Sequence, residues 1–124
     1  MSEPLRGVVV CHGRLAAALV EAVGQITGRT GRLVAVSNTD CDRGLLEERI
    51  AKAIAGAPAL VFVDMPSGSC LFAAVHRLQQ EPHVRVVTGV NLAMLIDFVF
   101  HGEESPADAA ERAVAAGGRA IRTP

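Results

Sequence analysis

The sequence predicts an α/β protein: a three-layer sandwich in which a mainly parallel central sheet carries helices on both faces. Four short apolar segments rich in β-branched residues recur along the chain, at residues 7–11, 33–36, 59–63 and 84–88. Helix-period patterns fill the intervals between them, and this alternation is typical of a parallel sheet with right-handed crossovers. The first and third segments are continuously apolar, as expected for strands that are covered on both faces.

Four intervals between or after these strands are expected to be helical. Residues 14–26 and 44–55 each carry one apolar stripe that can pack on the sheet. Residues 69–80 are apolar early and polar late, while residues 91–100 are almost wholly apolar and should be deeply packed or lie in an interface. The stripes consist of Leu15, Leu19, Val23 and Ile26 in the first helix and Leu46, Ile50, Ala53 and Ile54 in the second.

The last helix has a distinct start in the sequence. Ser105 offers a capping hydroxyl, Pro106 suits the first helical position, and Asp108 places an acid in the first turn. The pair Gly117-Gly118 is expected to end this helix. The tail at residues 119–122 alternates in polarity and could add a short edge strand.

Composition limits the classes of function. The 124 residues fit one domain spanning 1–124, and half of them are hydrophobic, so the chain can form its own core. Twelve basic and thirteen acidic side chains give a formal charge of −1, which provides no electrostatic footprint for nucleic acid or anionic lipid. Aromatic residues make up 3% of the chain, with no Trp or Tyr, so stacking platforms for bases are also lacking.

Cysteine usage and the N-terminus indicate a reduced, cytoplasmic protein. The three cysteines, Cys11, Cys41 and Cys70, are odd in number, widely spaced and not arranged as CxxC. The N-terminal residues show neither a charged n-region nor an apolar h-region, and the apolar stretches are too short to span a membrane.

Polar and glycine-rich loops follow each predicted strand. They are Cys11-His12-Gly13, then residues 37–40, then residues 64–70, and finally Gly89-Val90-Asn91. In a parallel sheet these loops rise on one edge, where ligands collect at the point at which the chain order reverses. The sequence therefore predicts a site at the carboxyl ends of the strands.

Phosphoryl transfer through a phosphohistidine is the chemistry that these residue types favour. His12 can act as a nucleophile near neutral pH if one ring nitrogen is held as a donor, and Asp64 at the end of a central strand can hold it. The turn Ser67-Gly68-Ser69 leads into a helix, so its hydroxyls and backbone N–H groups can cradle an anion. Such donors stabilise a transferring phosphoryl group without a cofactor or metal.

Simpler interpretations of the same residues stay open at this point. A histidine at a strand end is more often structural, Asp64 can form an Asx-turn, and Gly68 and Gly89 can merely supply positive φ. Metal or thiol chemistry is a further alternative, because Cys11, His12, Asp64 and Cys70 form a chemically reasonable zinc set. None of the usual close ligand spacings is present, so no metal ligand is predicted.

Three motifs in matching order connect the chain to a known family. They are VVVC-His12-Gly13-x-Leu-Ala, Val63-Asp64-x-x-x-Gly68-Ser69, and Thr88-Gly89-Val90-Asn91-Leu92-x-Met94-Leu95, of which the last is the most specific. From residue 6 to about residue 121, the sequence resembles enzyme IIA of the mannose/fructose/sorbose family of the bacterial phosphoenolpyruvate:sugar phosphotransferase system.

The resemblance implies a specific set of roles. A member of this family accepts a phosphoryl group from the phosphocarrier HPr on the histidine after the first strand and passes it to a IIB partner, working beside a membrane permease. By position, His12 is the acceptor, Asp64 orients it, and Ser67, Gly68 and Ser69 form the phosphate-facing turn. Gly13, Gly89 and Asn91 support the site, and Met94 and Leu95 belong to the helix behind it. The resemblance also implies a homodimer that exchanges its C-terminal strands.

Departures from the family pattern leave two alternatives. Ser67 replaces a glycine, Cys70 a proline, Phe72 an asparagine, and Cys11 a threonine. One alternative is a non-catalytic regulatory module that binds a partner through the same edge. The other is the phosphocarrier subunit of dihydroxyacetone kinase, against which the Gly89-Val90-Asn91-Leu92 motif argues.

Overall fold

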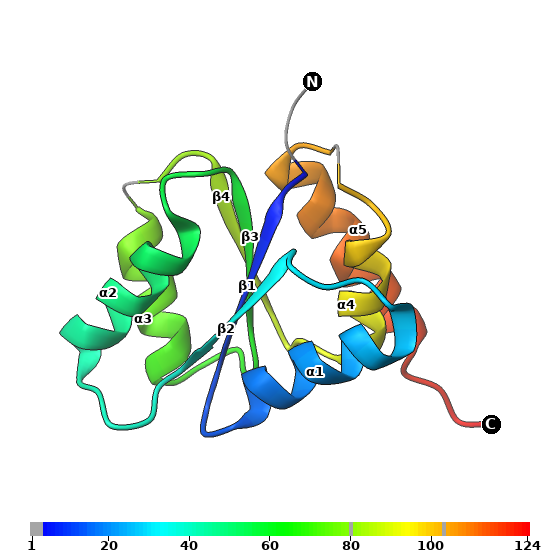
Figure 1. Cartoon of the computed structure of the whole chain (residues 1–124), viewed down its shortest axis with the longest axis horizontal. Helices are drawn as coiled ribbons and strands as arrows, with labels where there is room; N and C mark the ends of the chain where they lie inside the picture. Colours follow the sequence, from blue (N-terminus) through cyan, green and yellow to red (C-terminus); the bar gives the residue numbers. More distant parts are fainter. Residues whose placement is uncertain (1–3, 80, 103) are drawn as a thin grey trace.

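A computed structural model describes residues 4–79, 81–102 and 104–124, and Figure 1 shows its layers. Four parallel strands form one sheet in the order β2-β1-β3-β4. The strands are β1 (Arg6–Cys11), β2 (Leu33–Ser37), β3 (Ala59–Val63) and β4 (Val84–Thr88). The helices are α1 (Leu15–Thr27), α2 (Arg43–Ile54), α3 (Ser69–Leu78), α4 (Leu92–Val99) and α5 (Pro106–Arg119). The predicted three-layer α/β sandwich is confirmed.

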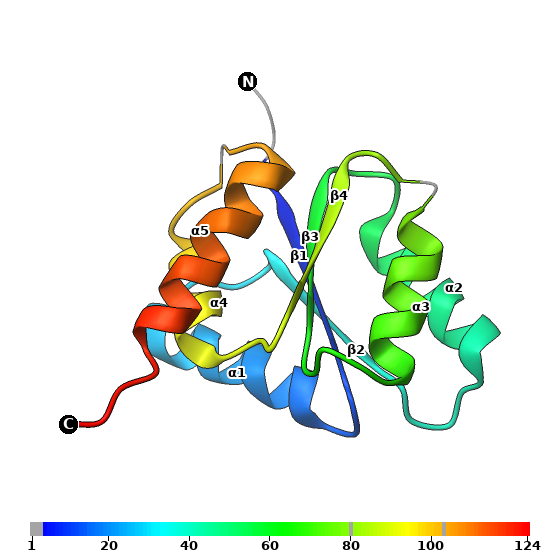
Figure 2. The same ribbon diagram turned by 180° about the vertical axis from the view of Figure 1, so that it is seen from behind.

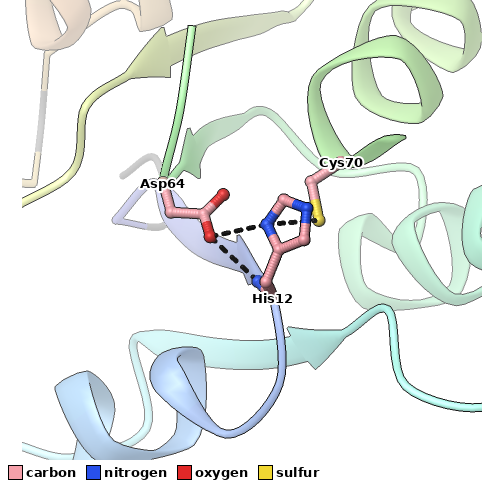
Figure 3. Close-up of side chains that lie close together, drawn as sticks. All are labelled: His12, Asp64 and Cys70. Atoms are coloured by element: carbon pink, nitrogen blue, oxygen red, sulfur yellow. Dashed lines mark hydrogen bonds and ion pairs between the residues drawn. The ribbon is translucent and has the colours of Figure 1, made fainter. Parts of the chain in front are cut away.

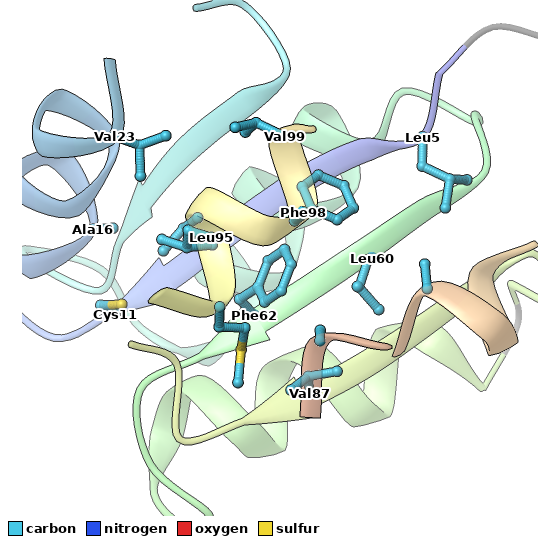
Figure 4. Packing of buried hydrophobic residues seen from close by; sticks show 14 residues of the cluster. Leu5, Cys11, Ala16, Val23, Leu60, Phe62, Val87, Leu95, Phe98 and Val99 are labelled. Carbon is cyan, nitrogen blue, oxygen red and sulfur yellow. The ribbon is translucent and has the colours of Figure 1, made fainter. Parts of the chain in front are cut away.

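Each face of the sheet has its own apolar core. Helices α1, α4 and α5 cover one face, and α2 and α3 cover the other (Figures 1 and 2). Alternate residues of β1 point to opposite layers, because Val9 packs with the first group of helices and Val8 and Val10 with the second. Figure 4 shows the first core, in which Phe62 and Phe98 meet edge to face at 5.2 Å between ring centroids. Both faces of the central strands are therefore buried, as their apolar sequences predicted.

The helices agree with the predicted stripes except at the ends of α1. Leu46, Ile50 and Ile54 of α2 are buried, whereas Leu15 and Ile26 of α1 are 44% and 60% exposed. Helix α1 buries only Ala16 and Val23 fully, so the middle of the helix makes the sheet contact and its two ends extend past the core. Residues 91–100 were expected to be deeply packed or to lie in an interface. Four α4 residues, Met94, Leu95, Phe98 and Val99, are buried, whereas Phe100 at the end of the segment is 51% exposed.

Two predictions at the chain's C-terminal end are wrong. Helix α5 does not stop at Gly117-Gly118 but continues to Arg119. Gly117 is buried against α4, where an added Cβ would lie 2.6 Å from Met94 Cε and 3.3 Å from both Met94 Cβ and Asn91 Oδ1. This glycine therefore serves helix packing and not termination. Residues 121–124 form no strand in this chain, and strand exchange in a dimer remains a prediction. Gln80, the predicted end of the helix that begins at Ser69, lies outside the described residues.

The register of the sheet brings the strand ends to one edge. Cys11 of β1 is level with Ser37 of β2, Val10 with Val63 of β3, and Val63 with Thr88 of β4. The four loops singled out in the sequence therefore emerge side by side.

Within the described ranges, no helix is both long and apolar enough to cross a membrane.

Candidate functional site

A histidine–carboxylate pair occupies the centre of this edge. His12 follows β1 and Asp64 follows β3, and the two strands are neighbours. One carboxylate oxygen, Asp64 Oδ2, accepts the backbone N–H of His12 at 2.9 Å and lies 2.8 Å from the ring atom Nδ1 (Figure 3). The His12 side chain is 43% exposed, whereas that of Asp64 is 9% exposed. A carboxylate at Nδ1 favours the tautomer that carries its proton there, which leaves a lone pair on Nε2.

The same contacts keep Asp64 ionised. Burial alone would raise the pKa of the Asp64 carboxyl, but the hydrogen bonds from the backbone and ring of His12 together outweigh burial and hold that pKa below its usual value. The second oxygen, Oδ1, is buried and has no hydrogen-bond partner among the residues described. The site thus holds one partly exposed imidazole against one buried negative charge.

The start of α3 lies against the free edge of the imidazole. Gly68 occupies the N-cap position with φ of 93°, and no side chain caps the helix there. A Cβ at Gly68 would lie 3.8 Å from both Cε1 and Nε2 of His12, so this turn approaches the ring closely. Ser67 and Ser69 on either side are exposed. The first N–H groups of a helix lack partners within the helix, so they are available to an anion beside Nε2.

The loop that carries His12 is held by two residues from the end of β2. Gly13, with φ of 59°, donates its N–H to Asn38 Oδ1 at 3.1 Å, and its carbonyl accepts the hydroxyl of Ser37 at 2.7 Å. From the sequence these two residues are predicted to lie on this edge, with no role in the site. Their position directly after a predicted strand was the available signal.

The β4 loop supports the site from further away. Gly89 has φ of 72°, and the next residue, Val90, donates its N–H to the carbonyl of Val63, immediately before Asp64. Asn91 caps α4 through Met94 N–H at 2.9 Å and donates to the carbonyl of Gly117 in α5 at 3.0 Å. The hydrogen bonds of Asn91 therefore join α4 to α5, and none of them reaches His12 or Asp64.

The cysteines separate onto opposite sides of the sheet. Cys70 is fully buried at the start of α3, with its Sγ 3.8 Å from His12 Nδ1 (Figure 3). Cys11 faces the other core, among residues of α1 and α4 (Figure 4). Of the four residues considered as metal ligands, His12, Asp64 and Cys70 come within 4.8 Å of one another and Cys11 does not join them. The four-residue zinc set considered as an alternative does not assemble, because side chains alternate across a strand and Cys11 faces the other core.

Their surroundings favour the protonated form of both buried thiols. Burial, followed by the charge of Asp64, raises the pKa of Cys11 to about 12 and that of Cys70 to about 11. Neither thiol is therefore a nucleophile at neutral pH by itself.

Fold and site together define a class: α/β sandwich domains that present a carboxylate-bound histidine at the carboxyl edge of a parallel sheet. The family described as the phosphotransferase-system (PTS) fructose IIA component, of the mannose type, matches residues 7–115, and the chain belongs to that family. The resemblance found in the sequence is thereby confirmed.

Solved structures described as PTS IIA proteins superimpose over nearly the whole chain. The mannose/sorbose-specific IIA subunit from Enterococcus faecalis shares 25% identity, with a TM-score of 0.85 and coverage of 98% of this chain and 95% of its own. The EIIA component from Streptococcus agalactiae shares the fold at 16% identity, with a TM-score of 0.89 and coverage of 96% of each chain. A IIA protein associated with a fucose utilization operon in Streptococcus pneumoniae does so at 18% identity, with a TM-score of 0.78 and coverage of 99% and 96%. No curated protein matches the sequence.

Proposed function

We propose that this protein is a phosphocarrier that accepts a phosphoryl group from phosphorylated HPr on Nε2 of His12 and delivers it to a IIB-type partner. One observation carries the proposal: Asp64 Oδ2 binds both the backbone N–H and the Nδ1 of His12, which leaves Nε2 as the free nitrogen beside the uncapped start of α3. Membership of the IIA family supports a role in sugar phosphotransfer.

The transfer needs only groups that are present in the chain. The Nε2 lone pair attacks phosphorus, the N–P bond forms, and the bond from phosphorus to HPr breaks. The ring then carries positive charge, and the adjacent carboxylate of Asp64 stabilises it. The phosphoryl oxygens meet the N–H groups at the start of α3, helped by Ser67, Gly68 and Ser69. The reverse steps deliver the group to the next acceptor.

Partners and location follow from the proposed role. We expect HPr and a IIB-type protein to approach the exposed face of His12, in the cytoplasm and at the surface of a sugar permease. Free thiols at Cys11, Cys41 and Cys70 agree with a reducing compartment. A homodimer is expected, and the exposed Ile121 in the tail, at 79%, is a residue that a second copy would cover.

Phosphorylation with phosphoenolpyruvate, enzyme I and HPr tests the proposal. Wild-type protein should gain acid-labile phosphate, and His12→Ala should gain none. His76 offers a matched control, because its Nδ1 lies 2.8 Å from Glu47 Oε1 in a second histidine–carboxylate pair away from the site. His76→Ala should label like the wild type. Labelling that survives in His12→Ala, or an unlabelled wild type that is folded, contradicts the proposal, and the latter result favours the regulatory module.

Acceptor specificity separates the two carrier roles. The phosphorylated protein should transfer its group to a mannose-family IIB domain and not to the nucleotide-binding subunit of dihydroxyacetone kinase. Transfer to the kinase subunit alone would assign the other carrier role.

A further inference from the structure

The side chains of His12, Asp64 and Cys70 form a three-donor cluster that combines a nitrogen, a carboxylate oxygen and a sulfur atom. Their donor atoms lie within 4.8 Å of one another. We propose that this cluster binds a thiophilic divalent cation, Zn²⁺ above all, and that the bound ion and phosphorylation of His12 exclude each other. The second part of this inference rests on the proposed function; the first does not.

The distances in the cluster suit zinc. Tetrahedral zinc, with bonds of about 2.0 Å to nitrogen and 2.3 Å to sulfur, separates these two donors by about 3.6 Å. In the structure Cys70 Sγ and His12 Nδ1 are 3.8 Å apart. Because no two donors are more than 4.8 Å apart, some point lies within about 2.8 Å of all three. The line from Nδ1 to Cys70 Sγ crosses the imidazole in Figure 3, so the Cys70 and His12 side chains must rotate to give zinc bond lengths on the Nδ1 lone pair. The pair closest together, Nδ1 and Oδ2 at 2.8 Å, would open slightly as the ion replaces the proton between them.

An unsatisfied charge in the cluster independently points to a ligand. The Asp64 side chain is 9% exposed, and its Oδ1 atom is buried without a hydrogen-bond partner in the part of the chain that is described. A buried carboxylate with an unpartnered oxygen is costly, and a cation bound by that carboxylate lowers the cost by neutralising its charge. The 43% exposure of His12 leaves an open side on which water can supply the fourth ligand.

Donor chemistry selects the ion. Thiolate and imidazole favour zinc and related metals, whereas Mg²⁺ and Ca²⁺ prefer sets made of oxygen alone. Binding releases the Cys70 thiol proton to solvent and forms S–Zn, N–Zn and O–Zn bonds, with no change of oxidation state. The sequence lacks the close ligand spacing that would predict a zinc site, but α3 brings the sulfur of Cys70 to the histidine in space.

Metal binding at Nδ1 reverses the tautomer that phosphoryl transfer needs. With Nδ1 bound to the ion, the proton of the neutral ring moves to Nε2. Nε2 then has no lone pair with which to attack phosphorus. Free zinc at about ten times its Kd leaves roughly one site in eleven without metal, so the phosphorylation rate should fall about tenfold.

Titration of the reduced 124-residue chain with Co²⁺ tests the metal site directly. Wild type should give a thiolate-to-cobalt charge-transfer band, which Zn²⁺ abolishes and Mg²⁺ does not. Cys70→Ser and Cys70→Ala should both lack the band, while the matched control Cys41→Ser should retain it, because Cys41 lies outside the cluster. Absence of the band in wild type, or its persistence in both folded Cys70 variants, overturns the inference.

Phosphorylation by purified phospho-HPr, freed from enzyme I, tests the exclusion. Zinc should slow labelling of wild type and of Cys41→Ser about tenfold and leave Cys70→Ala unaffected. Equal slowing of all three proteins, or none, overturns the exclusion. A cobalt band in a wild-type protein that never labels would refute the carrier function while supporting the metal site.

Discussion

A variant that removes the charge of Asp64 but keeps the shape of its side chain gives the sharpest test of the histidine–carboxylate pair. Asp64→Asn keeps the size of the side chain and removes the charge. In the structure a single oxygen accepts both N–H groups of His12, at 2.9 and 2.8 Å. The amide of the variant must place its carbonyl oxygen there, because its NH₂ group would oppose the backbone N–H. The favourable tautomer of His12 is therefore retained, and only the charge is lost.

The expected loss is modest for this reason. A hydrogen bond to a charged group contributes about 1.5–3 kcal/mol, against about 0.5–1.5 kcal/mol for a neutral one. The difference, about 1–1.5 kcal/mol on the ring contact, corresponds to roughly 5- to 10-fold slower phosphorylation of His12. A reversed tautomer would cost far more, on the order of 10⁴-fold in a comparable histidine–carboxylate system. Asp64→Ala, which removes the acceptor altogether, should fall between these limits.

Initial rates of acid-labile labelling from purified phospho-HPr measure the effect. Glu47→Gln at the His76 pair is the control and should label at the wild-type rate, because that pair lies outside the site. Equal rates for Asp64→Asn and wild type would refute the electrostatic role of Asp64. A 10⁴-fold loss would refute the argument that the backbone N–H fixes the amide orientation.

Further predictions concern packing, thiol reactivity and acid stability. Gly117→Ala should lower the free energy of unfolding by up to about 2 kcal/mol, since overpacking against α4 outweighs the gain in helix propensity. Gly118→Ala places its new Cβ where nothing lies within 4 Å, so it should raise the free energy of unfolding by about 0.5 kcal/mol. Thermal unfolding of both variants measures these changes. Under native conditions at pH 8, iodoacetamide should alkylate Cys41 well before Cys70, because burial raises the pKa of Cys70 to about 11. Mass spectrometry of the digested protein measures the order of alkylation, and the reverse order would show that burial does not control reactivity. Because the pKa of Asp64 is lowered on folding, its stabilising contribution is complete above its unfolded pKa of about 3.9 and is lost as pH falls through the folded value. Asp64→Asn should therefore flatten the decline of the urea midpoint of unfolding between about pH 5 and 3. An unchanged decline would argue against the lowered pKa.

The sheet was predictable from sequence because burial on both faces leaves a local signature. The segments 7–11 and 59–63 are apolar throughout, and their pairing at the centre of the sheet places the residues that follow them, His12 and Asp64, within hydrogen-bonding distance. The meeting of these two residues needed only strand order and a common edge.

Contacts set by helix–helix distance were not predictable in this way. Gly117 has the local appearance of a helix stop, and only the approach of Met94 from α4 shows why a side chain is excluded there. The roles of Ser37 and Asn38 likewise depend on how closely the end of β2 approaches Gly13. Such distances are properties of the packed layers, and no single segment encodes them.

The cysteines show how the alternation of side chains along one strand decides which thiol lies beside the imidazole. Cys11 and His12 are adjacent in sequence, which made Cys11 the obvious thiol neighbour of the imidazole. A strand directs successive side chains to opposite faces, so Cys11 enters the core beneath α1 and α4, where it lies with Val9. The thiol that reaches the ring comes from Cys70, 58 residues further along the chain, because α3 begins on the face of the sheet to which Val8 and Val10 point. A sulfur donor therefore lies 3.8 Å from Nδ1, the nitrogen that Asp64 also holds. This placement allows a metal ion to compete with phosphorylation through the ring's tautomer without occupying the position of the phosphoryl group.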